Sequence, residues 1–143
     1  MTREAVILSG GLGTRLQPVI KEIPKPMAPV GKKPFIEYLF NYLKSFNIEH
    51  IILSVGYKYE VIRDYFGNDF NGIKISYAIE NTPLGTGGGI KNALKFLKNG
   101  TSFLINGDTF FNVDLYKLYE FQQETGSYLS MSLKKLRDFD RYG

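Results

Sequence analysis

A group of glycines near the N-terminus, followed by an arginine and a lysine, has the composition of a phosphate-binding site. The glycines of residues 10–13 follow the apolar run of residues 5–8, and Arg15 and Lys25 come soon after. Glycines let backbone N–H groups approach an anion because no Cβ stands in the way. The Arg15 guanidinium presents a planar set of donors to phosphate oxygens. Lys25 adds a compact charge in a loop stiffened by two prolines, so the spacing predicts a site for phosphates.

This glycine-rich loop differs from two other phosphate-binding motifs. A P-loop has the pattern G-x-x-x-x-G-K-[ST], and no Lys-Ser or Lys-Thr follows these glycines. A dinucleotide-binding fingerprint has the pattern G-x-G-x-x-G, and Leu16 stands where its third glycine belongs. The pattern therefore disfavours a nicotinamide-dependent oxidoreductase. A plain glycine turn is the structural alternative, although a turn alone requires neither Arg15 nor Lys25.

A carboxylate follows the short apolar stretch of residues 102–105, in the order Asn106, Gly107, Asp108. An Asn-Gly pair can form a hairpin turn, but the residues after it do not return as an alternating strand. A carboxylate held at the end of a strand is the hard oxygen ligand that a divalent cation requires. We therefore regard Asp108 as a candidate metal ligand, with a turn or cap residue as the alternative. Asp114 is expected to be a helix cap.

A third candidate segment, residues 80–89, begins with Glu80 and continues with a proline and several glycines. Guanine presents its N1–H and N2–H₂ donors side by side, and one carboxylate can accept both. Uracil and thymine present one donor between two acceptors, which suits an amide such as glutamine better. At a site that binds a nucleotide base, Glu80 would therefore favour guanine, and a solvated residue after a strand is the alternative.

The apolar pattern predicts alternating strands and helices. Strands are expected at residues 3–9, 50–55, 73–79, 102–105 and 127–133, and helices at residues 34–46, 58–66, 88–98 and 114–124. Such alternation is typical of a parallel sheet covered by helices on both faces, where ligands gather at the carboxyl ends of the strands. The segments that follow the first four strands all carry candidate residues and are expected to converge: 10–15, 56–58, 80–89 and 106–108.

The composition is that of an ordinary globular domain. The 143 residues fit one domain, 43% of them are hydrophobic, and no apolar run approaches the ~20 residues of a membrane span. The absence of cysteine excludes disulfides and thiolate metal sites. Lys and Arg number 18 against 14 Asp and Glu, and this dispersed net charge of +4 favours an anionic substrate over nucleic acid. We expect a cytoplasmic protein that binds neither membranes nor nucleic acid, with His50, its single histidine, in a structural role.

The paired motifs resemble those of one known family. Residues 10–16 read G-G-L-G-T-R-L and residues 24–26 read P-K-P, which is similar to the signature of the sugar-1-phosphate nucleotidyltransferases. Ser9 and Gln17 depart slightly from the usual pattern. The resemblance implies a Rossmann-like three-layer α/β/α fold with a mainly parallel sheet, of which residues 1–143 would be the nucleotide-binding part of a single domain. Residues 80–86 resemble the base-reading loop of the guanylyltransferases that act on mannose 1-phosphate and heptose 1-phosphate. Among these enzymes, three segments look most like those that transfer GMP to D-glycero-D-manno-heptose 1-phosphate: 26–29, 53–57 and 106–111.

The resemblance also implies roles for individual residues in Mg²⁺-dependent transfer from GTP to a sugar 1-phosphate. Arg15 would bind the β- and γ-phosphates, Lys25 the α-phosphate and the sugar phosphate, and Asp108 the Mg²⁺. The implied nucleotide-binding residues are Leu8, Ser9, Gly10, Gly11, Gly13, Thr14, Arg15, Glu80, Pro83, Gly85 and Thr86. The implied sugar-binding residues are Asn106 and Gly143.

Two alternatives to guanylyl transfer stay open at this point. Residues 86–90 resemble a segment of the uridylyltransferases that act on hexose or muramate 1-phosphates, so UTP is a second candidate nucleotide. A nucleotide-sensing module of the same fold is another candidate, although such relatives typically lose the arginine, the lysine or the carboxylate. Family members are usually longer, so we expect a C-terminally truncated chain with weak or absent turnover. A homo-oligomer is compatible with the sequence.

Overall fold

The structure is a computed structural model that describes residues 1–11 and 23–135. The chain divides into two compact units, one of Thr2–Phe110 and one of Phe111–Gly143 together with Met1. The larger unit holds every strand found in the described ranges. It also holds all the described candidate site residues.

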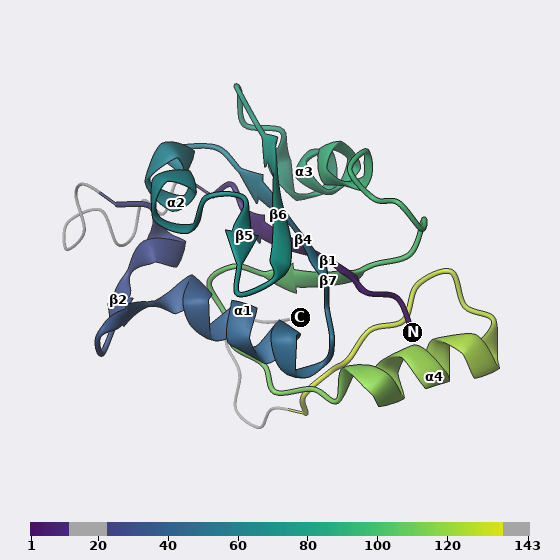
Figure 1. Ribbon diagram of the computed structural model, residues 1–143. Helices are drawn as coiled ribbons and strands as arrows, with labels where there is room; N and C mark the ends of the chain where they lie inside the picture. The colour runs from purple at the N-terminus through teal and green to yellow at the C-terminus, as the bar shows by residue number, and fades with distance from the viewer. Residues whose placement is uncertain (12–22, 136–143) are drawn as a thin grey trace. The chain divides into compact units, whose positions relative to one another are not determined.

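A five-stranded sheet forms the centre of the larger unit, with the strand order β5-β6-β4-β1-β7 (Figure 1). Its strands are β1 (Glu4–Ser9), β4 (His50–Val55), β5 (Asp69–Phe70), β6 (Ile73–Ile79) and β7 (Phe103–Asn106). Strand β1 pairs in parallel with both β4 and β7, and β4 pairs in parallel with β6. The edge strand β5 is antiparallel to β6. The four parallel strands therefore end at the same edge of the sheet, as the sequence predicted.

The helices begin and end where sequence signals place them in most cases. The helical elements are η1 (Lys25–Met27), α1 (Phe35–Ser45), α2 (Tyr59–Phe66), α3 (Gly85–Leu94) and, in the smaller unit, α4 (Leu115–Thr125). Pro34 occupies the N-cap position of α1. Asp114 caps α4 as predicted, because its side chain accepts hydrogen bonds from two backbone N–H groups of the first turn. None of the helices in the described ranges combines the length and apolar character needed to cross a bilayer.

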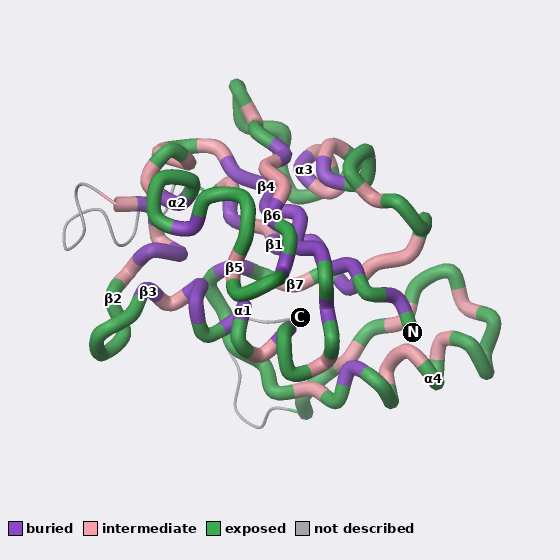
Figure 2. The backbone as a smooth tube through the Cα atoms, in the orientation of Figure 1, coloured by how far each residue is buried: buried purple, intermediate pink, exposed green. Residues whose placement is uncertain are grey.

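Both faces of the central strands are buried. On one face Ala93 of α3 packs with Val6, Ile52 and Ala78, which lie on three neighbouring strands. The strand residues that alternate with these, such as Ile7, are equally inaccessible and point to the opposite face. Helices α1 and α2 contribute buried apolar residues, and Figures 1 and 2 show the buried strands lying between α3 and α1. The mainly parallel sheet with flanking helices confirms the predicted fold class.

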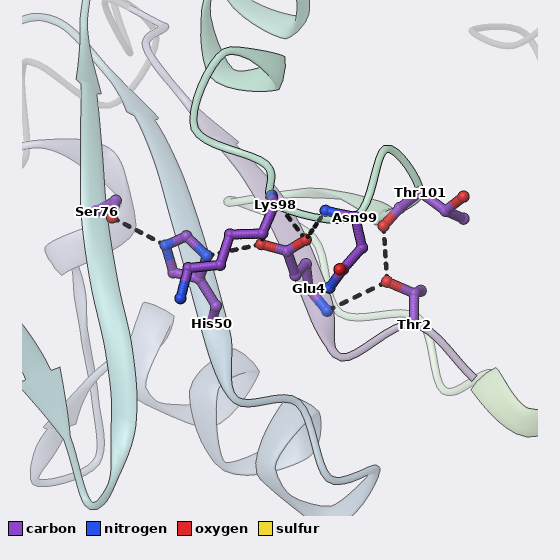
Figure 3. A network of polar contacts seen from close by, with 7 residues as sticks. All are labelled: Thr2, Glu4, His50, Ser76, Lys98, Asn99 and Thr101. Atoms are coloured by element: carbon purple, nitrogen blue, oxygen red, sulfur yellow. Dashed lines mark hydrogen bonds and ion pairs between the residues drawn. The ribbon is translucent and has the colours of Figure 1, made fainter.

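A buried polar network lies at the amino ends of the strands, away from the edge where the candidate residues converge (Figure 3). The Nδ1 atom of His50 lies 2.8 Å from Oε1 of Glu4, and Nε2 lies 2.9 Å from the hydroxyl of Ser76. The Glu4 carboxylate also accepts hydrogen bonds from the backbone N–H groups of Lys98 and Asn99. Burial opposes ionisation of Glu4, but these hydrogen bonds outweigh it and lower its pKa. His50 therefore connects strands, as expected of a structural histidine.

Two predicted elements were wrong, and three two-residue strands were not predicted. Residues 127–133 do not form the fifth predicted strand, and Leu129 and Leu133 are 75% and 80% exposed. Alternation indicates only strand propensity, and a strand also needs a hydrogen-bonded neighbour, which this segment lacks among the described residues. The helix expected at 88–98 is instead Gly85–Leu94, because close packing of Gly89 overrides the low helix propensity of glycine. The two-residue strands β2 (Pro29–Val30), β3 (Lys33–Pro34) and β5 are too short to show a period.

Candidate functional site

The candidate segments meet at the carboxyl edge of the sheet. The register places Leu8 opposite both Ser54 and Asn106, so β1, β4 and β7 end at the same level. Backbone hydrogen bonds tie the segments that follow: the N–H of Gly107 donates to Leu8 (2.8 Å) and the N–H of Glu80 donates to Val55 (2.7 Å). The predicted convergence is therefore confirmed for the described residues.

Lys25 and Asp108 form a direct ion pair, although they are 83 residues apart in the sequence. Lys25 opens the short helix η1, in which Pro26 and Met27 are buried and anchor the turn. The hydroxyl of Thr109 donates a further hydrogen bond to Asp108 (3.1 Å). The hydrogen bond from Lys25 lowers the pKa of the Asp108 carboxyl, against the opposing effect of partial burial. Asp108 is therefore ionised at neutral pH and carries its own counter-ion.

Asp108 is a single carboxylate rather than part of a metal cage. Within residues 1–11 and 23–135, no group of three or more His, Asp or Glu side chains is placed to share a cation. Mg²⁺ is usually held by one or two carboxylates together with substrate phosphates and waters. A single, partly exposed carboxylate fits that arrangement when a phosphate chain supplies further oxygens. A cation would have to compete with the Lys25 ammonium for Asp108.

The Glu80 carboxylate is held from two sides. The hydroxyl of Ser54 donates to Oε1 at 2.9 Å, and the backbone N–H of Leu84 donates to Oε2 at 3.1 Å. Two glycines make room for it, since a Cβ at Gly10 or Gly89 would lie 2.9 Å or 2.6 Å from Oε1. The sequence analysis identified Glu80 and missed Ser54. The available signal was one hydroxyl within the apolar strand of residues 50–55.

A close approach also explains Gly107, which the predicted site residues omit. A Cβ at this position would lie 2.7 Å from the carbonyl oxygen of Leu8 and would also overlap the hydroxyl of Ser9. Ser9 is 8% exposed, and its hydroxyl has no hydrogen-bond partner among the described residues. Only glycine therefore allows the backbone before Asp108 to pass this close to β1.

The remaining predicted residues divide by location. Several lie at the carboxyl edge or in the adjoining turn with exposed or half-buried surfaces: Leu8, Gly10, Gly11, Pro83, Gly85, Thr86 and Asn106. Gly85 is the first residue of α3 and has a φ of +70°, a conformation that favours glycine. Four predicted residues lie outside the described residues: Gly13, Thr14, Arg15 and Gly143.

The mainly parallel sheet and the polar residues at its carboxyl edge define an α/β domain with a candidate ligand site, and sequence comparison identifies its family. The profile of the nucleotidyl transferase family matches residues 4–143. The chain therefore belongs to the nucleotidyl transferase family.

Two curated relatives share a more specific description. The chain is 56% identical over 140 residues to D-glycero-alpha-D-manno-heptose 1-phosphate guanylyltransferase of Campylobacter jejuni. It is 51% identical over 140 residues to the protein of the same name from Aneurinibacillus thermoaerophilus. Each comparison covers 98% of this chain but 61% of the relative. The chain thus spans about three fifths of the length of these relatives.

Solved structures agree with this family. The crystal structure of HddC from Yersinia pseudotuberculosis has a TM-score of 0.75 and 45% identity, covering 83% of this chain and 53% of that one. HddC has also been crystallised in complex with GMP-PN, and that structure has a TM-score of 0.74. A UTP-bound UGPase from Acinetobacter baumannii is similar in fold, with a TM-score of 0.77 at 22% identity, covering 89% of this chain and 54% of that one.

Proposed function

We propose that this chain provides the nucleotide-binding part of a sugar 1-phosphate guanylyltransferase that uses D-glycero-D-manno-heptose 1-phosphate. The observation that carries the proposal is the meeting of the Lys25–Asp108 pair and the Glu80 carboxylate at one sheet edge. It is supported by the 56% identity to a heptose 1-phosphate guanylyltransferase across nearly the whole chain. The products would be a GDP-sugar and pyrophosphate.

The proposed reaction is a direct displacement at the α-phosphorus of GTP. An oxygen of the sugar phosphate forms the new bond to phosphorus, and the bond to the oxygen bridging the α- and β-phosphates breaks. The electron pair leaves with pyrophosphate, so no covalent enzyme intermediate is required. The protein's work is to align two anions and to reduce their repulsion. Lys25, released from Asp108, would donate to the α-phosphate and the sugar phosphate together.

Asp108 would hold Mg²⁺ jointly with the triphosphate. When bound there, the cation would supply positive charge to stabilise the pyrophosphate leaving group. The hydrogen bond from Lys25 lowers the pKa of the Asp108 carboxyl further, so Asp108 would meet the cation as a carboxylate. Arg15 with Gly13 and Thr14 would bind the phosphates, and Asn106 and Gly143 would contact the sugar.

Glu80 would select guanine. A carboxylate offers about four lone-pair sites, and the protein uses two of them through Ser54 and Leu84. The two sites left match the paired N1–H and N2–H₂ donors of guanine. Two further groups of residues would enclose the nucleotide. One lies at the end of β1 and in the loop after it (Leu8, Ser9, Gly10 and Gly11), and the other lies around the start of α3 (Pro83, Gly85 and Thr86).

The proposal is tested by calorimetric titration of GTP, UTP, dTTP, CTP and ATP into the chain with Mg²⁺. We expect GTP to bind at least about ten-fold more tightly than the others, a difference of about 1.4 kcal/mol. The variant Glu80→Gln tests the role of the carboxylate, because it keeps the size of the side chain and replaces one acceptor with a donor. It should abolish the preference. A preference for UTP in the parent chain would instead support a uridylyltransferase.

A further inference from the structure

We propose that Ser54 is a positioning residue for base selection: its hydroxyl fixes the Glu80 carboxylate in the orientation that reads guanine. This inference rests on the proposed function, because it presumes that Glu80 contacts the base. Ser54 would act through Glu80 and would not itself touch the nucleotide. No sequence motif singles it out.

The burial of Ser54 indicates a specific purpose for its hydroxyl. Ser54 is 1% exposed and lies on β4, the central strand of the sheet, opposite Leu8 on β1 and Ala78 on β6. A buried hydroxyl is costly unless it forms a hydrogen bond. The partner found is Oε1 of Glu80 at 2.9 Å, and a hydrogen bond to a charged group is among the stronger ones in proteins.

A second hydrogen bond restrains the carboxylate on its other side. The Leu84 N–H donates to Oε2, so each carboxylate oxygen has its own fixed donor. Ser54 belongs to β4, whereas Leu84 immediately precedes α3. The carboxylate is therefore restrained by a side-chain hydroxyl of β4 and by a backbone N–H of the turn before α3.

The glycines around Glu80 limit the alternatives to this orientation. A Cβ at Gly89 would lie 2.6 Å from Oε1 and 2.9 Å from the Ser54 hydroxyl, so the helix backbone packs directly against the hydrogen bond. A Cβ at Gly10 would lie 2.9 Å from the same oxygen. Without the Ser54 hydroxyl, Oε1 would lose its hydrogen-bond donor from β4. The carboxylate would then turn away and no longer offer both oxygens to guanine.

The test compares the binding of GTP with that of inosine triphosphate, which lacks the N2 amino group of guanine. The variants are Ser54→Ala, Glu80→Gln and the double variant, each titrated calorimetrically with Mg²⁺. Ser76→Ala is the matched control, because it also removes a hydroxyl hydrogen-bonded to a side chain of the sheet, but at the amino ends of the strands. Ser54→Cys keeps a side chain of similar size with a weaker donor, in case the alanine variant does not fold.

We expect Ser54→Ala to lower the preference for GTP over inosine triphosphate by about ten-fold, the magnitude of one hydrogen bond to a charged group. Ser54→Cys should give a smaller loss, and Ser76→Ala should leave the preference unchanged. In the Glu80→Gln background, Ser54→Ala should have no further effect on the preference, since the two residues act as one unit.

The outcomes separate the inference from the proposed function. A folded Ser54→Ala variant that loses stability but keeps the full preference, while Glu80→Gln loses it, would overturn the positioning role of Ser54 alone. An unchanged preference in Glu80→Gln would overturn the base-reading role of Glu80, and the Ser54 inference with it. Failure of the parent chain to bind any nucleotide would contradict both.

Discussion

Helix α3 contains two glycines, Gly87 and Gly89, with different surroundings. At Gly87 a new Cβ would meet nothing within 4 Å, whereas at Gly89 it would meet the Glu80 carboxylate at 2.6 Å and the Ser54 hydroxyl at 2.9 Å. Both residues lie within the helix. Replacing either by alanine should therefore favour the helix, but the steric consequences differ.

The expected magnitudes follow from these surroundings. Glycine costs a helix interior about 1 kcal/mol relative to alanine, so Gly87→Ala should raise the free energy of unfolding by up to about 1 kcal/mol. Overpacking typically costs about 1–3 kcal/mol, so Gly89→Ala should show a net loss of about 0–2 kcal/mol after the helix gain. The cost stays moderate because the Glu80 carboxylate is the end of a flexible side chain. The new Cβ should nevertheless displace the carboxylate, and the variant should lose its preference for GTP.

The assay combines urea unfolding with calorimetric titration of GTP and UTP for both variants. Gly87→Ala should bind both nucleotides as the parent does. Gly89→Ala should lose most of the discrimination, at least about ten-fold, while remaining folded. A folded Gly89→Ala variant with full discrimination would refute the reasoning that the position of the Glu80 carboxylate controls base selection.

Three further predictions concern other parts of the same unit. Gly107→Ala should lower the free energy of unfolding in urea by about 1–3 kcal/mol. Adding Ser9→Ala should not restore stability, because the carbonyl oxygen of Leu8 would still lie 2.7 Å from the new Cβ, and full rescue would contradict this. Folding lowers the pKa of Glu4, so its stabilising contribution is present above the ordinary carboxyl pKa and is lost as the pH falls through the folded-state pKa. In Glu4→Gln the free energy of unfolding should therefore fall less steeply at acid pH, and an unchanged acid dependence would argue against this role. Lys25→Ala should raise the pKa of Asp108 towards its ordinary value in an NMR titration, and an unshifted pKa would show that the ion pair does not form in solution. The free energy of unfolding should change by no more than about 1 kcal/mol, because the pair is partly exposed.

The fold was predictable because its elements carry regular apolar periods. The strand at 50–55 is mostly apolar and buried along its whole length, and α1 places Ile36, Leu39 and Leu43 on one buried stripe. The segment at 127–133 shows why period alone is insufficient. Its alternation resembles that of a strand, yet strand formation depends on a partner elsewhere in the fold, which no local pattern encodes.

The candidate site was predictable to the extent that residue types alone indicate a chemical role. Gly10, Glu80 and Asp108 come just after strands that end at one edge of the sheet, and Lys25 reaches this edge through its ion pair with Asp108. The contacts between them were not predictable. Neither the Lys25–Asp108 pair nor the hydrogen bond from Ser54 can be inferred from spacing, since each depends on side-chain geometry between distant segments.

A crystal structure of the chain with GTP and Mg²⁺ tests the central claim most directly. The account predicts the guanine N1 and N2 atoms within hydrogen-bond distance of the Glu80 carboxylate, with Ser54 still bound to Oε1. It also predicts that Lys25 leaves Asp108 for a phosphate oxygen and that Asp108 contacts the cation. A nucleotide whose base lies away from Glu80, with the Lys25–Asp108 pair intact, would contradict it.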